Sequence, residues 1–143
     1  MALNDAVLTG PQGGRTVTSA DGSTAELKVE GDHTGGQWSV VEWNVRAGGE
    51  GPIHTHTRED ETVYVLEGAV TAFVGDQEIE VEAGSYAALP KGVSHGVKVR
   101  GESARLLLTL IPAGAEYFLV PRDDSDHDPA KFGLLVHSDA PQS

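Results

Sequence analysis

Residues 48–68 read GGEGPIHTHTREDETVYVLEG, a glycine-rich loop that runs into polar residues and then into an apolar stretch. His54 and His56 are two residues apart, so both imidazoles lie on one face if this segment is a strand. Glu61 follows five residues after His56 and directly precedes the stretch 62–66, whose β-branched and aromatic residues are typical of a strand. The segment therefore predicts a loop followed by a strand, with chemically active side chains between them.

Short apolar stretches separated by glycine and proline continue on both sides of this segment. The clearest is 38–46, in which Val41, Trp43 and Val45 alternate with polar residues. No window of about ten residues shows the apolar period of a helix, about 3.6 residues. About eight short strands at regular spacing predict an all-β sandwich or barrel. The expected strands are 25–31, 38–46, 62–66, 69–74, 78–81, 85–89, 95–99 and 105–111.

Composition excludes several classes of function. The chain has 143 residues, with 10 Lys and Arg against 22 Asp and Glu, and a formal net charge of −12. This charge repels nucleic-acid phosphate and anionic lipid, so we expect no nucleic-acid partner and no membrane partner. There are no cysteines, which excludes disulfides and thiolate metal sites. The start of the chain shows no signal peptide, so we expect a cytoplasmic protein.

The length predicts a single domain. Residues 1–22 are polar and glycine-rich and are interpreted as a flexible lead-in, and residues 23–122 as the β-barrel. Residues 123–143 are interpreted as an acidic tail that packs on the barrel or on a partner subunit, with 131–137 covering a sheet edge. Few Lys or Pro residues are available to guard edge strands, so we also expect a homodimer.

A second glycine-framed segment, residues 84–95, reads GSYAALPKGVSH and ends in His95. His54, His56 and His95 together with Glu61 offer three imidazoles and one carboxylate. In the absence of thiols, this donor set is typical of one divalent transition metal: Fe, Mn, Co, Ni, Cu or Zn.

The remaining three histidines are His33, His127 and His137. Isolated polar side chains of this kind usually lie on the surface, and we interpret all three in that way. One alternative stays open, in which His33 or His137 replaces Glu61 as the fourth ligand.

The two segments resemble the paired signatures of the cupin superfamily, and the similarity covers residues 34–118. The resemblance implies a single-domain antiparallel jelly-roll barrel, also called a double-stranded β-helix, with one metal held inside it. The family's ligand positions correspond here to His54, His56, Glu61 and His95. The second signature usually ends in Asn four residues after its histidine, where this chain has Val99, so the cavity wall is expected to be less polar.

Residues 34–36, 58–68 and 112–118 look like the small one-domain cupins grouped with bacterial quercetinases. This resemblance implies ring-cleaving dioxygenation of a flavonol-like polyphenol. Metal-dependent polyketide cyclases of aromatic antibiotic biosynthesis are also one-domain cupins. Ring closure of a poly-β-ketone, with Zn²⁺ as a Lewis acid and no redox step, is therefore the alternative. A cupin that binds a small ligand without converting it is the second alternative, because a fold does not fix a function.

Both enzymatic alternatives would proceed through an enolate at the metal. A divalent ion with three neutral imidazole ligands keeps most of its charge and can acidify an enol, a β-dicarbonyl or a catechol-like group. Glu61 would be the fourth ligand or the catalytic general base. We expect an apolar cavity for a small, hydrophobic, aromatic or polyketide-like substrate. The residues expected to line it are Val41, Trp43, Val63, Val65, Phe73, Tyr86, Val97, Val99, Leu106 and Leu108.

Overall fold

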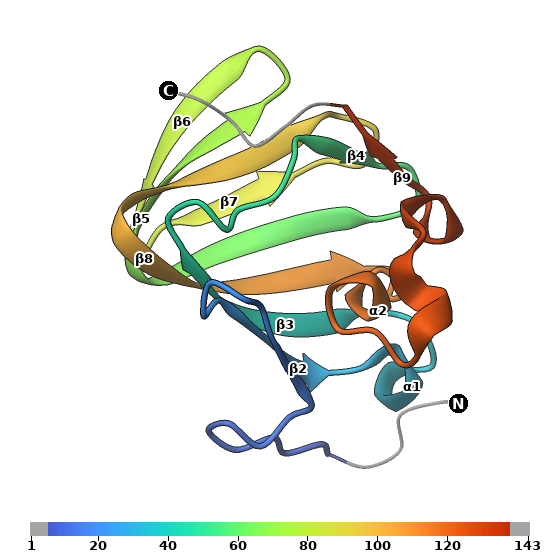
Figure 1. Cartoon of the computed structure of the whole chain (residues 1–143). Coiled ribbons are helices and arrows are strands. Elements are labelled where there is room, and N and C mark those ends of the chain that lie inside the picture. The colour runs from blue at the N-terminus through green and yellow to red at the C-terminus, as the bar shows by residue number, and fades with distance from the viewer. Residues whose placement is uncertain (1–5, 138–143) are drawn as a thin grey trace.

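A computed structural model describes residues 6–137, so the ends of the expected lead-in and tail, 1–5 and 138–143, lie outside the described part. The described chain is mostly β-structure, with a few helices of about one turn each (Figure 1). The strands are β1 Thr16–Thr18, β2 Thr24–Val29, β3 Ser39–Arg46, β4 His54–His56, β5 Asp60–Val74, β6 Gln77–Glu82, β7 Tyr86–Leu89, β8 His95–Ile111 and β9 Leu134–Val136. The α-helices are α1 Gly31–Thr34 and α2 Glu116–Leu119, and the 3-10 helices are η1 Asp124–His127 and η2 Pro129–Phe132.

The strands form one antiparallel sheet that folds on itself without closing. Its main path is β1-β2-β3-β8-β4-β9, and β5 branches from β8 to pair with β6 and β7 as well. The long strand β8 pairs with β5 along most of its length, pairs with β3 along its second half, and reaches β4 at its first residue. This is the jelly-roll arrangement expected from the sequence, and the all-β prediction is confirmed.

Two of the strands are longer than predicted. β5 combines the expected strands 62–66 and 69–74, and β8 combines 95–99 and 105–111. Gly68 falls in the expected break between the strands 62–66 and 69–74, but it has φ +79° and lies where the pairing of β5 with β8 shifts register. A glycine at positive φ bends the backbone at low steric cost, so the strand continues through a bulge.

The core lies between the two layers of the sheet and is mostly aliphatic. Val41, Val45, Val65 and Leu106 are fully buried, and each such side chain stabilises the fold by about 2 kcal/mol relative to an exposed one. Inward and outward residues alternate as predicted on β3, and they also alternate in the first part of β5, from Glu61 to Val65.

Two predicted cavity residues, Tyr86 and Phe73, point away from this core. Tyr86 is 65% exposed because it pairs with Tyr64, which lies on the outward face of β5. Its hydroxyl donates a hydrogen bond to the Thr62 hydroxyl. Cross-strand partners point to the same face of a sheet. Phe73 follows the buried Ala72 on β5, so strand alternation turns it outward.

The C-terminal segment, coloured orange to red in Figure 1, runs from α2 past η1 and η2 to β9. β9 pairs with β4, with Leu134 opposite His56 and Val136 opposite His54. The sheet edge beside the two histidines is therefore covered by residues about 80 positions later in the chain. Within residues 6–137, no helix has both the length and the apolar character needed to cross a membrane.

Candidate metal centre

Three strands bring the four predicted ligand residues together. β4 carries His54 and His56, β5 carries Glu61 near its start, and β8 begins with His95 directly opposite His54. One ligand atom from each of the four residues lies within 4.8 Å of the others. The Nε2 atom of His56 is 3.2 Å from Nε2 of His54 and 3.0 Å from Oε1 of Glu61, and His95 Nε2 is 3.8 Å from the same Glu61 oxygen.

Burial sets the electrostatics of the cluster. It lowers the pKa of His54, and it lowers the pKa of His95 to about 4, so both are neutral donors near pH 7. Burial also lowers the pKa of His56, but hydrogen bonds to Glu59 and Glu61 outweigh it and raise that pKa to about 9. For Glu61, burial favours the neutral form, but His56 and the other imidazoles outweigh it and leave the pKa of the carboxyl lowered. Glu61 is therefore an anion facing three imidazoles.

The donor atoms fit a divalent transition metal. Both ring nitrogens of His95 are buried and have no hydrogen-bond partner among the described residues. A buried polar group left without a partner costs about 1–3 kcal/mol, so such groups call for an explanation. The Nε2 atom faces the other donors, and three imidazole nitrogens with one carboxylate oxygen could hold such an ion.

The other described histidines lie elsewhere. His33 accepts a hydrogen bond from the Glu30 backbone at the start of α1, and His137 Nε2 is 2.6 Å from the Thr55 hydroxyl. His127 is exposed at the end of η1. Neither His33 nor His137 belongs to the group of side chains that could hold an ion, whereas Glu61 does.

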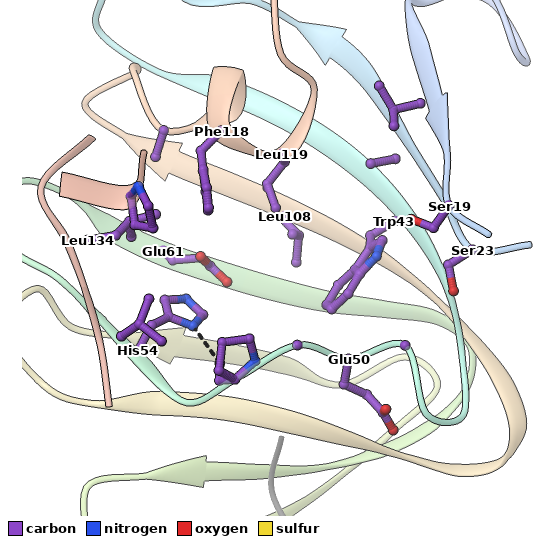
Figure 2. Close-up of a pocket in the computed structure, with 18 of the residues that line it drawn as sticks. Ser19, Ser23, Trp43, Glu50, His54, Glu61, Leu108, Phe118, Leu119 and Leu134 are labelled. Atoms are coloured by element: carbon purple, nitrogen blue, oxygen red, sulfur yellow. Dashed lines mark hydrogen bonds between the residues drawn. The ribbon is translucent and has the colours of Figure 1, made fainter. Parts of the chain in front are cut away.

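A cavity of about 430 Å³ opens onto the cluster, within the range typical of small-molecule sites. Figure 2 shows His54 and Glu61 at one end, Leu108 and Trp43 along the middle, and Ser19 and Ser23 beyond Trp43. The full lining is Val17, Ser19, Ser23, Thr24, Ala25, Trp43, Gly49, Glu50, Gly51, Pro52, His54, His56, Glu61, Leu108, Ala115, Phe118, Leu119, Pro129, Leu134 and Val136.

The predicted lining was wrong for most residues. Only Trp43 and Leu108 of the ten expected residues contribute to the cavity wall. Six others pack in the core: Val41, Val63, Val65, Val97, Val99 and Leu106. Part of the wall comes instead from the C-terminal segment, including Phe118, Leu119 and Leu134. No local pattern indicates that these residues return to the site.

Sequence reasoning also missed Glu59. This residue is 2% exposed, and its Oε1 lies 2.6 Å from Nδ1 of His56, on the side of the ring away from Glu61. The alternation of a strand offers a signal, because Glu59 and Glu61 are two residues apart and share a face if the strand begins early.

Comparison with known proteins agrees with this architecture. The Cupin domain family model matches residues 41–111, which includes all four residues of the cluster. KdgF from Halomonas sp. superposes with a TM-score of 0.68 at 15% identity, over 77% of this chain and 96% of that one. The chain belongs to the cupin family.

Two relatives have names that state an activity. A quercetin 2,3-dioxygenase of Bacillus subtilis (strain 168) is 29% identical over 86 residues, which is 60% of this chain. The match spans only 26% of that enzyme's length. The polyketide cyclase RemF from Streptomyces resistomycificus is 25% identical with a TM-score of 0.55, over 62% of this chain and 64% of that one.

Proposed function

We propose that the protein is a metal-dependent cupin enzyme that cleaves a ring of a flat, hydrophobic polyphenol with O₂, in the manner of a quercetinase. The observation that carries this proposal is the cluster of three imidazoles and one carboxylate at the end of an apolar cavity. An isolated surface metal site would not need such a cavity.

Different residues of the chain would bind the ion, accept a proton and exclude water at this site. His54, His56, His95 and Glu61 would hold the ion, which when bound supplies Lewis acidity to an enol or catechol-like oxygen. The lowered pKa of Glu61 keeps its carboxylate ionised near neutral pH, so it can accept the hydroxyl proton of a substrate. Leu108 and Phe118 exclude water from the reacting group.

The cavity wall favours an uncharged aromatic ligand. Trp43 offers an aromatic ring face at mid-cavity, and Ser19 and Ser23 add hydroxyl groups beyond it. No lysine or arginine lines the cavity within the described residues, while Glu50 and Glu61 do. Away from the ion, a phosphate or carboxylate group would meet the negative charge of Glu50 with no basic side chain in the lining to offset it. A polyphenol with ring hydroxyl groups matches both the apolar and the polar parts of the wall.

The test is metal analysis followed by an oxygen-electrode assay. We expect about one divalent transition metal per chain after reconstitution, and O₂ consumption when quercetin is added. The cluster proposal fails if none of Mn, Fe, Co, Ni, Cu or Zn is retained. The dioxygenase proposal fails if the metal-loaded protein consumes no O₂ with any flavonol tested.

The second candidate is ring closure of a poly-β-ketone, and the likeness to RemF favours it. Here the same Glu61 carboxylate would remove a proton from a carbon flanked by two carbonyl groups, and the cavity wall would fold the chain of the substrate. O₂ separates the two candidates. Anaerobic cyclisation by the Zn²⁺-loaded protein, with no flavonol-dependent O₂ consumption, would support ring closure and overturn the first proposal.

A further inference from the structure

We propose that Glu59 is a positioning residue for the metal centre, and that its carboxylate holds the His56 ring so that Nε2 faces the other ligands. The inference rests on the metal site proposed above. It assigns a role to a residue that is not itself one of the four ligands.

The His56 ring lies between two groups of different kinds. On one side its Nδ1 is 2.6 Å from Oε1 of Glu59, and on the other its Nε2 is 3.0 Å from Oε1 of Glu61 and 3.2 Å from Nε2 of His54. His56 and Glu59 are 6% and 2% exposed, so water does not compete for this contact. When a cation binds, the ring keeps the proton on Nδ1, which is donated to the carboxylate of Glu59, and releases the proton on Nε2, whose lone pair then faces the cation.

The three imidazoles differ at the nitrogen away from the cluster. His54 Nδ1 is 3.1 Å from the carbonyl oxygen of Pro52, a neutral acceptor. His95 Nδ1 is buried without a partner among the described residues. His56 alone of the three is paired at Nδ1 with a carboxylate. A charged acceptor makes a shorter and stronger hydrogen bond, and it increases the electron density on the ligating nitrogen.

The burial of Glu59 is not explained by a gain in the free energy of folding. The His56 ring is the hydrogen-bonding partner that the described structure gives to this buried carboxylate. Burying a carboxylate is costly, and one partner seldom repays that cost. The next residue, Asp60, is exposed and accepts a hydrogen bond from the Lys91 backbone. Two acidic residues in sequence thus have opposite environments, and only one contacts a ligand.

The experiment measures Zn²⁺ and Co²⁺ affinity of the full-length protein by competition with a chelator. We expect Glu59→Gln, whose amide oxygen can still accept from Nδ1, to weaken binding about 10-fold, and Glu59→Ala about 100-fold. Asp60→Asn is the matched control, because it removes the same charge one residue away while keeping an oxygen acceptor for Lys91. It should bind as the wild type does.

Side-chain ¹H–¹⁵N spectra of the Zn²⁺-loaded protein give a second readout. The wild type and Glu59→Gln should show His56 protonated at Nδ1 and metal-bound at Nε2. If Glu59→Ala is poorly folded, Glu59→Gln carries the test alone, because it keeps the shape of the side chain.

The outcomes separate this inference from the proposed function. Wild-type affinity in Glu59→Gln and in a folded Glu59→Ala, or equal weakening in Asp60→Asn, would overturn the positioning role and leave the metal site intact. A wild-type protein that binds neither Zn²⁺ nor Co²⁺, and retains none of Mn, Fe, Ni or Cu, would overturn the metal site itself.

Discussion

Glu61 can serve the site in two ways, as a metal ligand or as a proton acceptor, and the two roles respond differently to substitution. Its carboxylate contacts His56 and faces His95, so it lies within reach of both a bound ion and the substrate cavity. An amide in its place keeps the size and one oxygen donor but is a very weak base.

We therefore predict that Glu61→Gln keeps the metal and loses turnover by about 100-fold or more. His95→Ala is the counterpart, because it removes an imidazole and should lose metal and activity together. Metal content and kcat, measured on the same preparations, check both. Near-normal turnover of Glu61→Gln would show that the carboxylate is not the base.

Trp43 is the aromatic residue at mid-cavity, and a flat substrate would stack on it. Stacking is worth about 0.5–1.5 kcal/mol beyond the area buried. We predict that Trp43→Leu weakens binding of quercetin by about 10-fold, as measured anaerobically by calorimetry. Trp38→Leu is the control, because Trp38 lies outside the cavity lining and is 37% exposed. Equal affinities of the two variants would count against stacking.

The four residues of the cluster could be predicted because their spacing and residue types are local features of the sequence. Glu59 could not be assigned in the same way, because its contact with His56 depends on the turn between β4 and β5. The cavity wall was less predictable still. Leu134 reaches the site through the pairing of β9 with β4, and Phe118 reaches it from α2, and no local pattern indicates either arrangement.

At the scale of elements, Gly68 decides whether β5 is one strand or two. A Cβ at this position would lie 2.7 Å from the Ser103 carbonyl oxygen, and its φ of +79° is strained for other residues. Sequence patterns indicate a glycine turn here, but they cannot show that the hydrogen bonds with β8 resume on the far side of it.

We predict that Gly68→Ala destabilises the metal-free protein by roughly 3 kcal/mol, the upper end of the cost of such strain, because steric overlap adds to it. Gly101→Ala is the matched control, since Gly101 has φ +93° and nothing within 4 Å of a built Cβ. It should cost about 1 kcal/mol. Urea unfolding measures both, and equal losses would show that the approach to Ser103 is unimportant.

At the scale of the whole molecule, the expected homodimer stays a prediction, and β9 is the element that motivates it. One side of β9 pairs with β4, no strand of the described chain pairs with its other side, and Leu135 and Val136 are 53% and 50% exposed. Light scattering at micromolar concentration should give twice the 15.0 kDa chain mass. Leu135→Lys should shift the protein to monomer, whereas Ile79→Lys on β6 should not. A monomeric wild type would refute the prediction.

The pH dependence of stability combines two opposing effects. The formal net charge of −12 at pH 7 disfavours the compact state, and acid relieves that repulsion. Asp126 has the opposite effect, because acid removes its contribution to the stability of the fold. It is 1% exposed and accepts hydrogen bonds from Lys131 and from the Arg122 backbone, and these lower its pKa from 3.8 to about 2.

Because the folded-state pKa of Asp126 is depressed, its stabilising contribution is complete above about pH 5 and is lost as the pH falls from about 4 to about 2. We predict that Asp126→Asn lowers the unfolding temperature at pH 7, and that its gap from the wild type closes across this acid range. The comparison uses metal-free protein, so that metal release does not contribute. Asp76→Asn, in the exposed turn between β5 and β6, should stay close to the wild type throughout. A gap for Asp126→Asn that widens in acid would show that this carboxylate does not anchor the C-terminal segment in its ionised form.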